Sequence, residues 1–580
     1  MSKSEPQFRP APAGAARLST KLLLLALYLA FDHASVAERV ASLGLSTELL
    51  AFLVLYGALV LALCAAAFIL STPLRVIAAA VLAIGSVMLQ SYEWSTGSPL
   101  VYEAFEMMVA SRGDAGDALS QHGTVLLQAI GAASILFLAI ALPPGRFALR
   151  YGIGWIIPLG AVIALAGMLY LRGGEGAKAL PAPFSPLAQG AIMATLGLTE
   201  KEHPRQAVNL TPSRALATGD VVLVIDESVA ANYLDINQRA GVYSGLAGDR
   251  PGLRIANFGV AASIANCSAG SNRTLRFGGT RANYRRAAEE MPSVWAYAHR
   301  AGFRTVYLDG QRQGGQLQNL MTPAERAEID DFIQIGDTPV PERDHRLAQL
   351  LGERLHNGTA ELILVNKVGA HFPVADKFPD AAAKFRPLPV RGRSEGITDI
   401  ASLPGVTAES EDDWRLYRNA YRNTVAWSTG GFFDRLLPQV PGTGAVILYT
   451  SDHGQDLHER GGAGGSTHCV PDPRPEEGAV PLVAITGSDS TVDWRTYSSA
   501  NFDGMSHFRI FPTLLAVMGY APEQTVAFYG PSLMSATKDD YSFTPTYNAS
   551  LGRDPTWRRL DRADLAVPPV ADYAQFAGAP

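Results

Sequence analysis

The chain has 580 residues, of which 48% are hydrophobic and 18% are charged, and its mean hydropathy is +0.09. Globular proteins usually carry about 25% charged residues, more than this chain has. A chain that is this hydrophobic and this weakly charged is not disordered or collagen-like. Three cysteines are too few for a disulfide scaffold. The 48 Lys and Arg against 54 Asp and Glu give a net charge of −6, which excludes a protein that binds nucleic acid through bulk positive charge.

The first third of the chain contains five apolar runs that predict transmembrane helices. The longest carries no charge and has about the length that spans a bilayer core. The shortest is the first run, which extends through weakly polar residues to Val36 and places Asp32 and His33 near its outer end. The five runs are Leu22–Phe31, Leu49–Leu70, Val76–Gln90, Val125–Leu142 and Tyr151–Leu171.

Basic residues in the short loops predict the orientation of these spans. They are Lys3, Arg9, Arg17 and Lys21 before the first span, Arg75 between the second and third, and Arg146 and Arg150 between the fourth and fifth. With five spans all three groups fall on one side, which the positive-inside rule makes cytoplasmic, so everything after Leu171 is exported. A cleaved signal peptide is the alternative for Leu22–Phe31, although no small-residue cleavage site follows it.

Two further helices are predicted outside the spans. Tyr102–Ala110, in the exported loop from Ser91 to His122, has an amphipathic pattern suited to a membrane surface, with an ordinary solvated connection as the alternative. From Gly173 the composition shifts to Gly, Pro, Lys and Glu, and Leu187–Leu198 then predicts an interfacial or bridging helix. We therefore expect a transmembrane domain over 1–172, a linker over 173–215 and an exported globular domain over 216–580.

The exported part has the pattern of an α/β domain with a central, mainly parallel sheet. Apolar, β-branched runs are typical of buried parallel strands, and helical segments lie between them. The predicted strands are Val221–Ile225, Arg304–Leu308, Leu362–Val365, Val446–Tyr449 and Leu482–Ile485, and the predicted helices include Ser293–Ala301 and Asp413–Leu437.

Polar residues follow three of these strands. They are Asp226, Glu227 and Ser228 after the first, His371 after Leu362–Val365, and Asp452 and His453 after Val446–Thr450. Ligands of open α/β sheets bind at the carboxyl ends of strands, and carboxylate oxygen with imidazole nitrogen suits zinc, with manganese as the alternative. Taken singly, these residues are explained as caps, turns or loop histidines. Their combination, with His458 and His468 farther along, predicts a metal centre.

A serine-rich segment, Cys267 to Arg273, supplies the candidate nucleophile. A serine hydroxyl needs a metal ion or a base to lower its pKa before it attacks, and a nearby metal would supply this. Ser268 is the first candidate and Ser271 the second. Cys267 and Cys469 each adjoin a site motif, so a disulfide between them in an oxidising compartment stays open.

These motifs, in this order, resemble those of membrane-anchored phosphoethanolamine transferases of the alkaline phosphatase and sulfatase superfamily, which include lipid A modifying enzymes. The resemblance covers nearly the whole chain. It implies about five transmembrane helices followed by an alkaline phosphatase/sulfatase-like α/β domain, placed in the bacterial inner membrane with the catalytic domain in the periplasm. The matching segments are Val222–Ser228, Gly369–Pro373 with Lys377–Pro379, Tyr417–Thr424 and Tyr449–Gly454.

The resemblance also implies the reaction and the site residues. Zn²⁺ would be the cofactor. One ion is expected, and a second ion is the alternative, because Asp226 could serve as a further acidic ligand. The chain would transfer phosphoethanolamine from phosphatidylethanolamine, through a phosphoserine intermediate on Ser268, to lipid A or another envelope lipid or glycan. The implied metal ligands are Glu227, Ser268, Asp452 and His453, and the implied substrate-binding residues are His371 and His468.

Three positions depart from the family pattern. The family usually has threonine where Ser268 lies, glycine where Asp226 lies and often Asp where Arg422 lies. The spacing of Ser268 to Leu275 and Gly278 is closer to the sulfatase signature. A phosphoglycerol transferase or lipid phosphodiesterase on the same site is therefore the nearest alternative. A sulfatase and a non-catalytic pseudoenzyme are the others.

Overall fold

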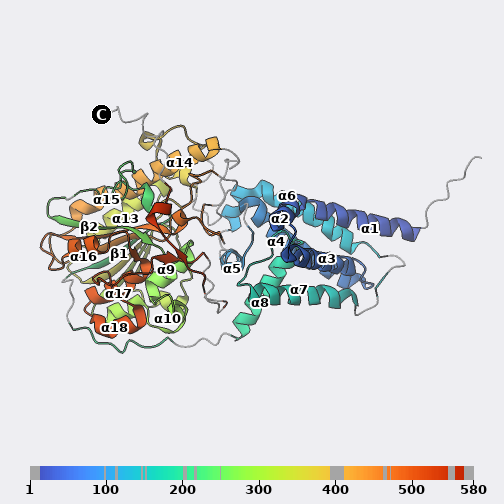
Figure 1. Ribbon diagram of the computed structural model, residues 1–580, viewed down its shortest axis with the longest axis horizontal. Helices are drawn as coiled ribbons and strands as arrows, with labels where there is room; N and C mark the ends of the chain where they lie inside the picture. Colours follow the sequence, from blue (N-terminus) through green and yellow to red (C-terminus); the bar gives the residue numbers. More distant parts are fainter. Residues whose placement is uncertain are drawn as a thin grey trace, which may run out of the picture. The chain divides into compact units, whose positions relative to one another are not determined.

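The chain divides into two compact units, Met1–Lys201 and Glu202–Pro580, in the computed structural model (Figure 1). Some sequence predictions lie outside the described residues, namely those on Lys3, Arg9, Arg146, Arg150 and Phe372. The described residues are 13–96, 99–110, 115–144, 148–149, 153–199, 205–213, 219–248, 250–371, 373–391, 411–461, 467–470, 472–545, 551 and 555–566.

The first unit is built from helices. Four of its described helices, α3, α4, α6 and α7, are long and apolar enough to cross a membrane. The pair α1 and α2, bent by 62° beside Asp32, makes a fifth span if counted as one, so the prediction of about five spans is confirmed. The helices are α1 (Ala13–Ala30), α2 (His33–Leu43), α3 (Thr47–Ala67), α4 (Thr72–Thr96), α5 (Tyr102–Ala110), α6 (Ala115–Ala141), α7 (Ile153–Leu171) and α8 (Phe184–Thr199).

Two of the predicted loop cations meet at one end of the first unit. The Lys21 ammonium donates to the carbonyl oxygens of Ile140 at 3.1 Å and Leu142 at 2.7 Å, and the Arg75 guanidinium donates to that of Ala141 at 3.1 Å. Cations are favoured beside the unpaired carbonyls at a helix C-terminus. The start of the first span, the loop after the second and the end of the fourth therefore share one side, as the predicted topology requires.

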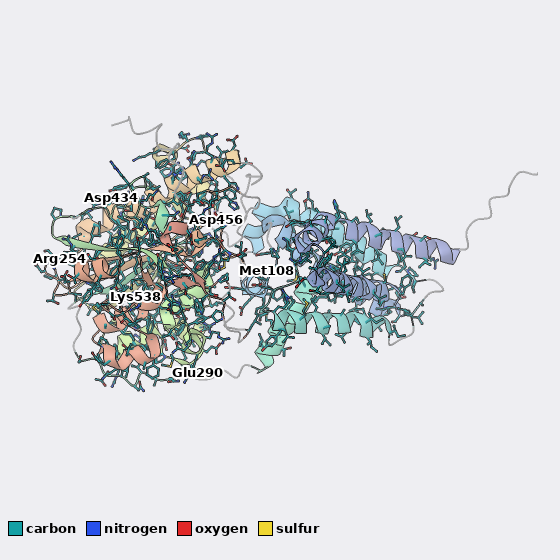
Figure 2. The ribbon with its side chains drawn as sticks, in the orientation of Figure 1. Met108, Arg254, Glu290, Asp434, Asp456 and Lys538 are labelled. Carbon is teal, nitrogen blue, oxygen red and sulfur yellow. A yellow bond between two sulfur atoms is a disulfide. The ribbon has the colours of Figure 1, made fainter. Side chains whose placement is uncertain are left out.

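The predicted surface helix is present as α5, and it packs on its neighbours in the first unit. Phe105 is buried in a cluster with Leu89 and Ala182, and Met108 (labelled in Figure 2) is partly buried against the same cluster. The helix predicted at Leu187–Leu198 is α8, which packs on α7 and α4 within the same unit. The limits of the linker and of the exported domain stay a prediction.

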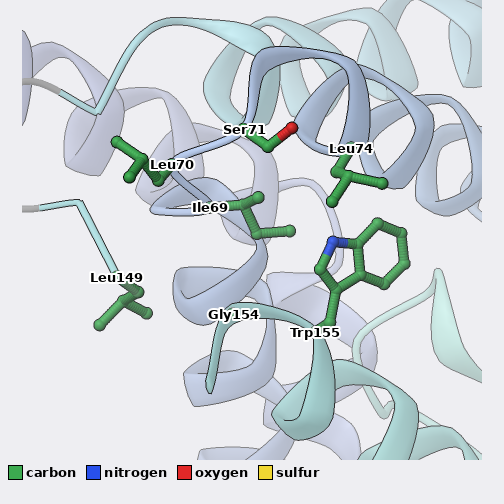
Figure 3. Close-up of a pocket in the computed structure, with 7 residues that line it drawn as sticks. All are labelled: Ile69, Leu70, Ser71, Leu74, Leu149, Gly154 and Trp155. Atoms are coloured by element: carbon green, nitrogen blue, oxygen red, sulfur yellow. The ribbon is translucent and has the colours of Figure 1, made fainter. Parts of the chain in front are cut away.

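A glycine allows α7 to begin directly against the turn between α3 and α4. A Cβ atom at Gly154 would lie 2.8 Å from Cγ1 of Ile69, which is closer than side-chain carbons approach. Small residues at helix contacts let backbones come together in membrane proteins. The small apolar hollow left at this turn is lined by Ile69, Leu70, Ser71, Leu74, Leu149, Gly154 and Trp155 (Figure 3).

The second unit contains an eight-stranded sheet in the order β4-β3-β5-β1-β6-β7-β2-β8. The paired strands run parallel except where β7 lies antiparallel to both β6 and β2. The sheet strands are β1 (Val221–Asp226), β2 (Leu253–Ala262), β3 (Arg304–Asp309), β4 (Asp331–Gln334), β5 (Glu361–Asn366), β6 (Val446–Ser451), β7 (Ala479–Gly487) and β8 (Met505–Ser506). A separate antiparallel pair is β9 (Ser542–Phe543) and β10 (Arg558–Arg559).

The prediction that Leu482–Ile485 forms a parallel strand is wrong in direction. These residues lie in β7, which is buried along its whole length and runs antiparallel to both neighbours. A continuous apolar run reports burial of both faces of a strand, and this burial is the same for either direction. The mainly parallel character of the sheet is nevertheless confirmed.

Helices cover both faces of the sheet (Figure 1). Alternate side chains of β1 point to opposite faces, with Leu223 in one apolar core and Val222 in the other. The core around Val222 includes residues of α13, α14 and α15, and the core around Leu223 includes residues of α9, α11 and α17. The helices are α9 (Ser268–Phe277), α10 (Tyr284–Glu290), α11 (Val294–Arg300), α12 (Pro323–Arg326), α13 (Val340–Arg354), α14 (Glu411–Val425), α15 (Gly431–Leu436), α16 (Trp494–Ala500), α17 (Ile510–Val517) and α18 (Pro522–Tyr529).

Candidate active site

The carboxyl ends of β1 and β6 bring three predicted metal ligands together. β1 pairs in parallel with β5 on one side and β6 on the other, so all three strands end at the same edge. The backbone N–H of Asp452 donates to the carbonyl oxygen of Asp226 at 2.9 Å, which continues the pairing of β1 and β6 to the site. One ligand atom from each of Glu227, Asp452 and His453 lies within 4.8 Å of the others, and all three residues are buried.

Hydrogen bonds orient His453 and Asp452 so that His453 Nε2 and Asp452 Oδ2 lie close to Glu227. His453 Nδ1 lies 2.8 Å from the Gly454 carbonyl oxygen, and this contact leaves Nε2 available to a metal. Asp452 Oδ1 accepts from the backbone N–H groups of Ser228 and His453, whereas Oδ2 is buried without a hydrogen-bond partner among the described residues. His453 Nε2 lies 3.5 Å from Glu227 Oε1 and 3.7 Å from Asp452 Oδ2.

The charges of this cluster also fit a cation. Burial and the charge of Glu227 raise the pKa of Asp452 to about 7. Although burial opposes it, the carboxylates of Asp452 and Glu227 raise the pKa of His453 to about 9. The carboxylates of Glu227 and Asp452 therefore repel each other in the protein interior. A divalent cation would relieve this repulsion and would take the place of the proton on His453. The orphaned Asp452 oxygen and the freed imidazole nitrogen fit Zn²⁺, whose ligands are carboxylate oxygen and imidazole nitrogen.

The structure places Ser268 beside this cluster and places Ser271 elsewhere. Ser268 Oγ donates to Glu227 Oε1 at 3.1 Å and lies 3.2 Å from His453 Nε2. Ser268 is the first residue of α9, where the unpaired N–H groups of a helix favour negative charge. Ser271 is buried, and its Oγ contacts the backbone of Ala265 at 3.2 Å and 3.1 Å. Of the two candidates, Ser268 therefore has the geometry of a nucleophile.

The two predicted substrate-binding histidines lie at the same edge. The His468 ring stacks on that of His453 with 4.4 Å between ring centroids, and burial together with the charge of His453 lowers the pKa of His468 well below its usual value. Although burial opposes it, the interaction with His453 and then the charge of His371 lower the pKa of the Glu227 carboxyl, which places His371 near Glu227. His458 instead stacks on Trp414 at 3.9 Å, which gives it a packing role.

A disulfide ties the nucleophile segment to the segment that carries His468. Cys267 and Cys469 are bonded, with 5.0 Å between their Cα atoms, and each directly adjoins a site residue. The Cys469 N–H also donates to the Asn266 carbonyl oxygen at 3.0 Å. The disulfide that the sequence left open is therefore present, and it fixes Ser268 and His468 relative to each other.

Asp226 makes several internal contacts. Its Oδ2 accepts from the Lys367 ammonium at 2.6 Å, from Thr429 at 2.8 Å and from Tyr449 at 3.1 Å. Its Oδ1 accepts from the backbone N–H of Glu227 at 3.2 Å. Lys367 and Asp226 are fully buried. Asp226, one of the departures from the motif that the sequence resembles, is thus paired with a lysine directly after β5.

Arg422, another of the three departures, is fully buried in α14 and lies over the Tyr233 ring at 5.7 Å. Its guanidinium also donates to Asn419 Oδ1 at 3.2 Å. These contacts give Arg422 a packing environment within the second unit.

Two further polar residues, Lys367 and Gln311, lie at the carboxyl ends of strands, where ligands of open α/β sheets bind. Neither was a predicted site residue. Lys367 directly follows β5, and Gln311 lies two residues after the end of β3. Gln311 Nε2 donates to Glu227 Oε2 at 3.1 Å. The strand Arg304–Leu308 was expected, so inspection of the polar residues after it would have found Gln311.

Comparisons with known proteins agree with this architecture. A family model described as Sulfatase matches residues 220–520, more than half of the chain. A comparison with curated proteins finds no match. The integral membrane protein lipooligosaccharide phosphoethanolamine transferase A from Neisseria meningitidis is 17% identical, with a TM-score of 0.59, over 89% of this chain and 98% of that chain. The C-terminal periplasmic domain of EcEptC from Escherichia coli is 17% identical, with a TM-score of 0.44, over 57% of this chain and 90% of that chain. The first similarity confirms the predicted fold.

Proposed function

We propose, from the premise that the chain belongs to the sulfatase family, that it is a membrane-anchored transferase of phosphoethanolamine. The donor is phosphatidylethanolamine, and the acceptor is lipid A or another envelope lipid or glycan. The observation that carries the proposal is the contact of Ser268 Oγ with both Glu227 and His453, two members of the candidate metal cluster. A serine held against metal ligands at a helix N-terminus is suited to nucleophilic attack on phosphorus.

The proposed cofactor is one Zn²⁺ held by Glu227, Asp452 and His453, with Ser268 as a further ligand. When bound, the ion lowers the pKa of the serine hydroxyl and neutralises negative charge on the phosphoryl oxygens. The chain holds two of the ligands ready, because Asp452 Oδ1 accepts from the Ser228 N–H and His453 Nδ1 donates to the Gly454 carbonyl oxygen. Pre-set ligands of this kind avoid reorganisation during the reaction.

In the first half-reaction, the Ser268 hydroxyl gives its proton to a neighbouring base, and its oxygen attacks the phosphorus of the donor. A bond from Ser268 Oγ to phosphorus forms, and the bond from phosphorus to the glycerol oxygen of the lipid breaks. Diacylglycerol leaves after its oxygen takes up a proton, and Ser268 retains the phosphoethanolamine group as a phosphoserine. We assign delivery of this proton to His371 and contact with the phosphoryl oxygens to both His371 and His468, which lie beside the cluster.

In the second half-reaction, an oxygen of the acceptor attacks the phosphoserine from the opposite side. The Ser268 oxygen leaves and takes its proton back, and the acceptor proton passes to a neighbouring base, so the enzyme returns to its starting state. The disulfide between Cys267 and Cys469 keeps the nucleophile and His468 at a fixed position relative to each other through both steps. Positioning of reacting groups is a large part of phosphoryl-transfer catalysis.

The helical unit supports a lipid donor and acceptor. Its four to five apolar helices anchor the enzyme in the layer in which both substrates reside. We place the protein in the bacterial inner membrane with its catalytic unit in the periplasm, because the basic loop residues Lys21 and Arg75 share one end of the helical unit.

The test is mass analysis of envelope lipids from cells with the gene, without it, and with the Ser268→Ala variant. We expect an added phosphoethanolamine group that disappears in the deletion and in Ser268→Ala but persists in the matched control Ser271→Ala. A glycerol phosphate group would indicate a phosphoglycerol transferase. Release of the head group to water without a modified acceptor would indicate a phosphodiesterase. Aryl sulfate hydrolysis lost in Ser268→Ala would indicate a sulfatase, and identical lipids in all strains would indicate a pseudoenzyme.

A further inference from the structure

Gln311 is a buried residue at the active site that the proposed mechanism does not use. Gly310, directly after β3, donates its N–H to the Asn366 carbonyl oxygen at 2.9 Å and so carries the pairing of β3 and β5 to the site. The Gln311 amide nitrogen donates to Glu227 Oε2 at 3.1 Å and to the carbonyl oxygen of Lys367 at 2.7 Å. One amide group therefore joins the end of β3 to the ends of β1 and β5.

A buried carboxylate fixes the backbone from which Gln311 projects. Asp309, the last residue of β3, is fully buried, and its Oδ1 accepts from the Gln311 N–H at 2.9 Å. The same carboxylate accepts from Gln318 at 3.0 Å, Asn366 at 3.1 Å and Gln334 at 2.9 Å. A carboxylate with this many donors holds its surroundings in one arrangement, since a displaced donor would be left unpaired in the interior.

The two oxygens of Glu227 consequently have different surroundings. Oε1 accepts from the hydroxyls of Ser268 at 3.1 Å and Ser228 at 3.0 Å and lies 3.5 Å from His453 Nε2. Oε2 points the other way and accepts from Gln311. The amide thus sets the rotation of the carboxylate and presents Oε1 to the nucleophile.

We propose that Gln311 is a positioning residue that makes Glu227 a one-oxygen ligand of the active-site metal. The proposal rests on the proposed function, because it requires a metal at Glu227. A carboxylate without the amide contact is free to rotate and to offer both oxygens to the ion. Partners that orient a metal ligand change metal affinity or activity by about 10- to 100-fold when removed. Gln311 acts through Glu227 and does not contact the reacting atoms.

The test compares full-length wild-type protein with Gln311→Met, which keeps the length of the side chain and removes its donor. Gln313→Met is the matched control, because Gln313 is exposed on the same loop. The affinity for Zn²⁺ is measured by chelator competition in detergent, and the visible spectrum is recorded with Co²⁺ in place of Zn²⁺. We expect Gln311→Met to bind Zn²⁺ about 10- to 100-fold more weakly. We also expect weaker Co²⁺ absorption, because a second carboxylate oxygen raises the coordination number.

Each result decides the inference. Weaker binding and an altered spectrum in Gln311→Met, with wild-type values in Gln313→Met, support it. Wild-type affinity and spectrum in Gln311→Met overturn it and leave the proposed function standing. Equal losses in both variants also overturn it, because they indicate general destabilisation. Failure of the wild-type protein to bind Zn²⁺ overturns the proposed function and the inference together.

A second variant guards against misfolding. If metal-free Gln311→Met melts below the wild type, the same measurements are made on Gln311→Asn, which keeps the amide but is one methylene too short for Glu227 Oε2. The same fold-change in affinity is expected there, and wild-type affinity in a folded Gln311→Asn overturns the inference.

Discussion

Removal of the Lys367 ammonium tests whether Asp226 depends on an internal cation. Lys367 Nζ lies 2.6 Å from Asp226 Oδ2 and 3.6 Å from Asp344 Oδ2, and the Lys367 and Asp226 side chains are fully buried. Lys367→Met keeps most of the side-chain volume and leaves the Asp226 charge without its closest opposite charge. We expect this variant to destabilise the second unit, and we expect Asp226→Asn in the same chain to restore most of the loss.

The magnitude follows from the burial of the pair. Removing one partner of a buried ion pair costs about 3–5 kcal/mol, because the remaining charge is left uncompensated. With an unfolding entropy of roughly 2.1 cal/mol/K per residue, the second unit has about 0.8 kcal/mol/K, so the melting temperature falls by about 4–6 °C. Replacing both residues leaves no charge at position 226 or 367, and the Asp344 carboxylate keeps the hydrogen bonds that it accepts from the N–H groups of Val368 and Gly369. Buried pairs exchanged for neutral groups are often close to neutral in stability.

The assay is a double-mutant cycle on the full-length protein in detergent, with melting followed by intrinsic fluorescence. The four proteins are the wild type, Lys367→Met, Asp226→Asn and the double variant. Lys384→Met is the control, because Lys384 is exposed. We expect the double variant to melt higher than Lys367→Met, with a coupling of about 2–3 kcal/mol. Additive losses from the two single substitutions would refute the reasoning.

Two further predictions concern buried ionisable groups of the second unit. Burial, together with the charge of Arg343, lowers the pKa of Lys377 to about 7. The charged form is therefore penalised below that pH, and the penalty fades as pH rises toward the unfolded value of 10.5. Melting curves should show the free energy of unfolding of Lys377→Met to exceed that of the wild type by up to about 4 kcal/mol at pH 7. The difference should shrink toward pH 10, and an equal difference at both pH values would contradict this reasoning. Burial raises the pKa of Glu477 to about 8, so its contribution to stability is complete below about pH 4.5 and is lost as pH rises through 8. The melting temperature should fall less between pH 5 and 8 in Glu477→Gln than in the wild type, and parallel pH profiles would exclude this role.

The position of the candidate metal cluster could be predicted because its residues follow strands that the local pattern reveals. Val221–Ile225 and Val446–Thr450 are continuous apolar runs, and neighbouring parallel strands end at one edge. Glu227 and Asp452 therefore had to lie close together once these runs were neighbours. The serine segment carried a weaker local signal, and geometry was needed to separate Ser268 from Ser271.

The position of Gln311 after a predicted strand marks it as a candidate, but its role could not be predicted because that role depends on contact between segments far apart in the chain. It lies 84 residues from Glu227, and a glutamine after a strand has no local pattern that reveals its partner. Asp226 and Lys367 are 141 residues apart in the chain, so the periodicity of the sequence does not predict their pairing either. Each of these contacts arises only when the sheet order places β3, β5 and β1 side by side.

The sequence by itself determined the spans, the α/β character and the edge of the sheet that carries the candidate site. These features depend on the length and period of apolar runs, which are local properties of a chain. Tertiary structure decided the direction of β7, the disulfide between Cys267 and Cys469, and the use of Asp226 as the partner of a buried lysine. These depend on which segments meet in space, and the free energy that selects such contacts comes from burial shared by the whole domain.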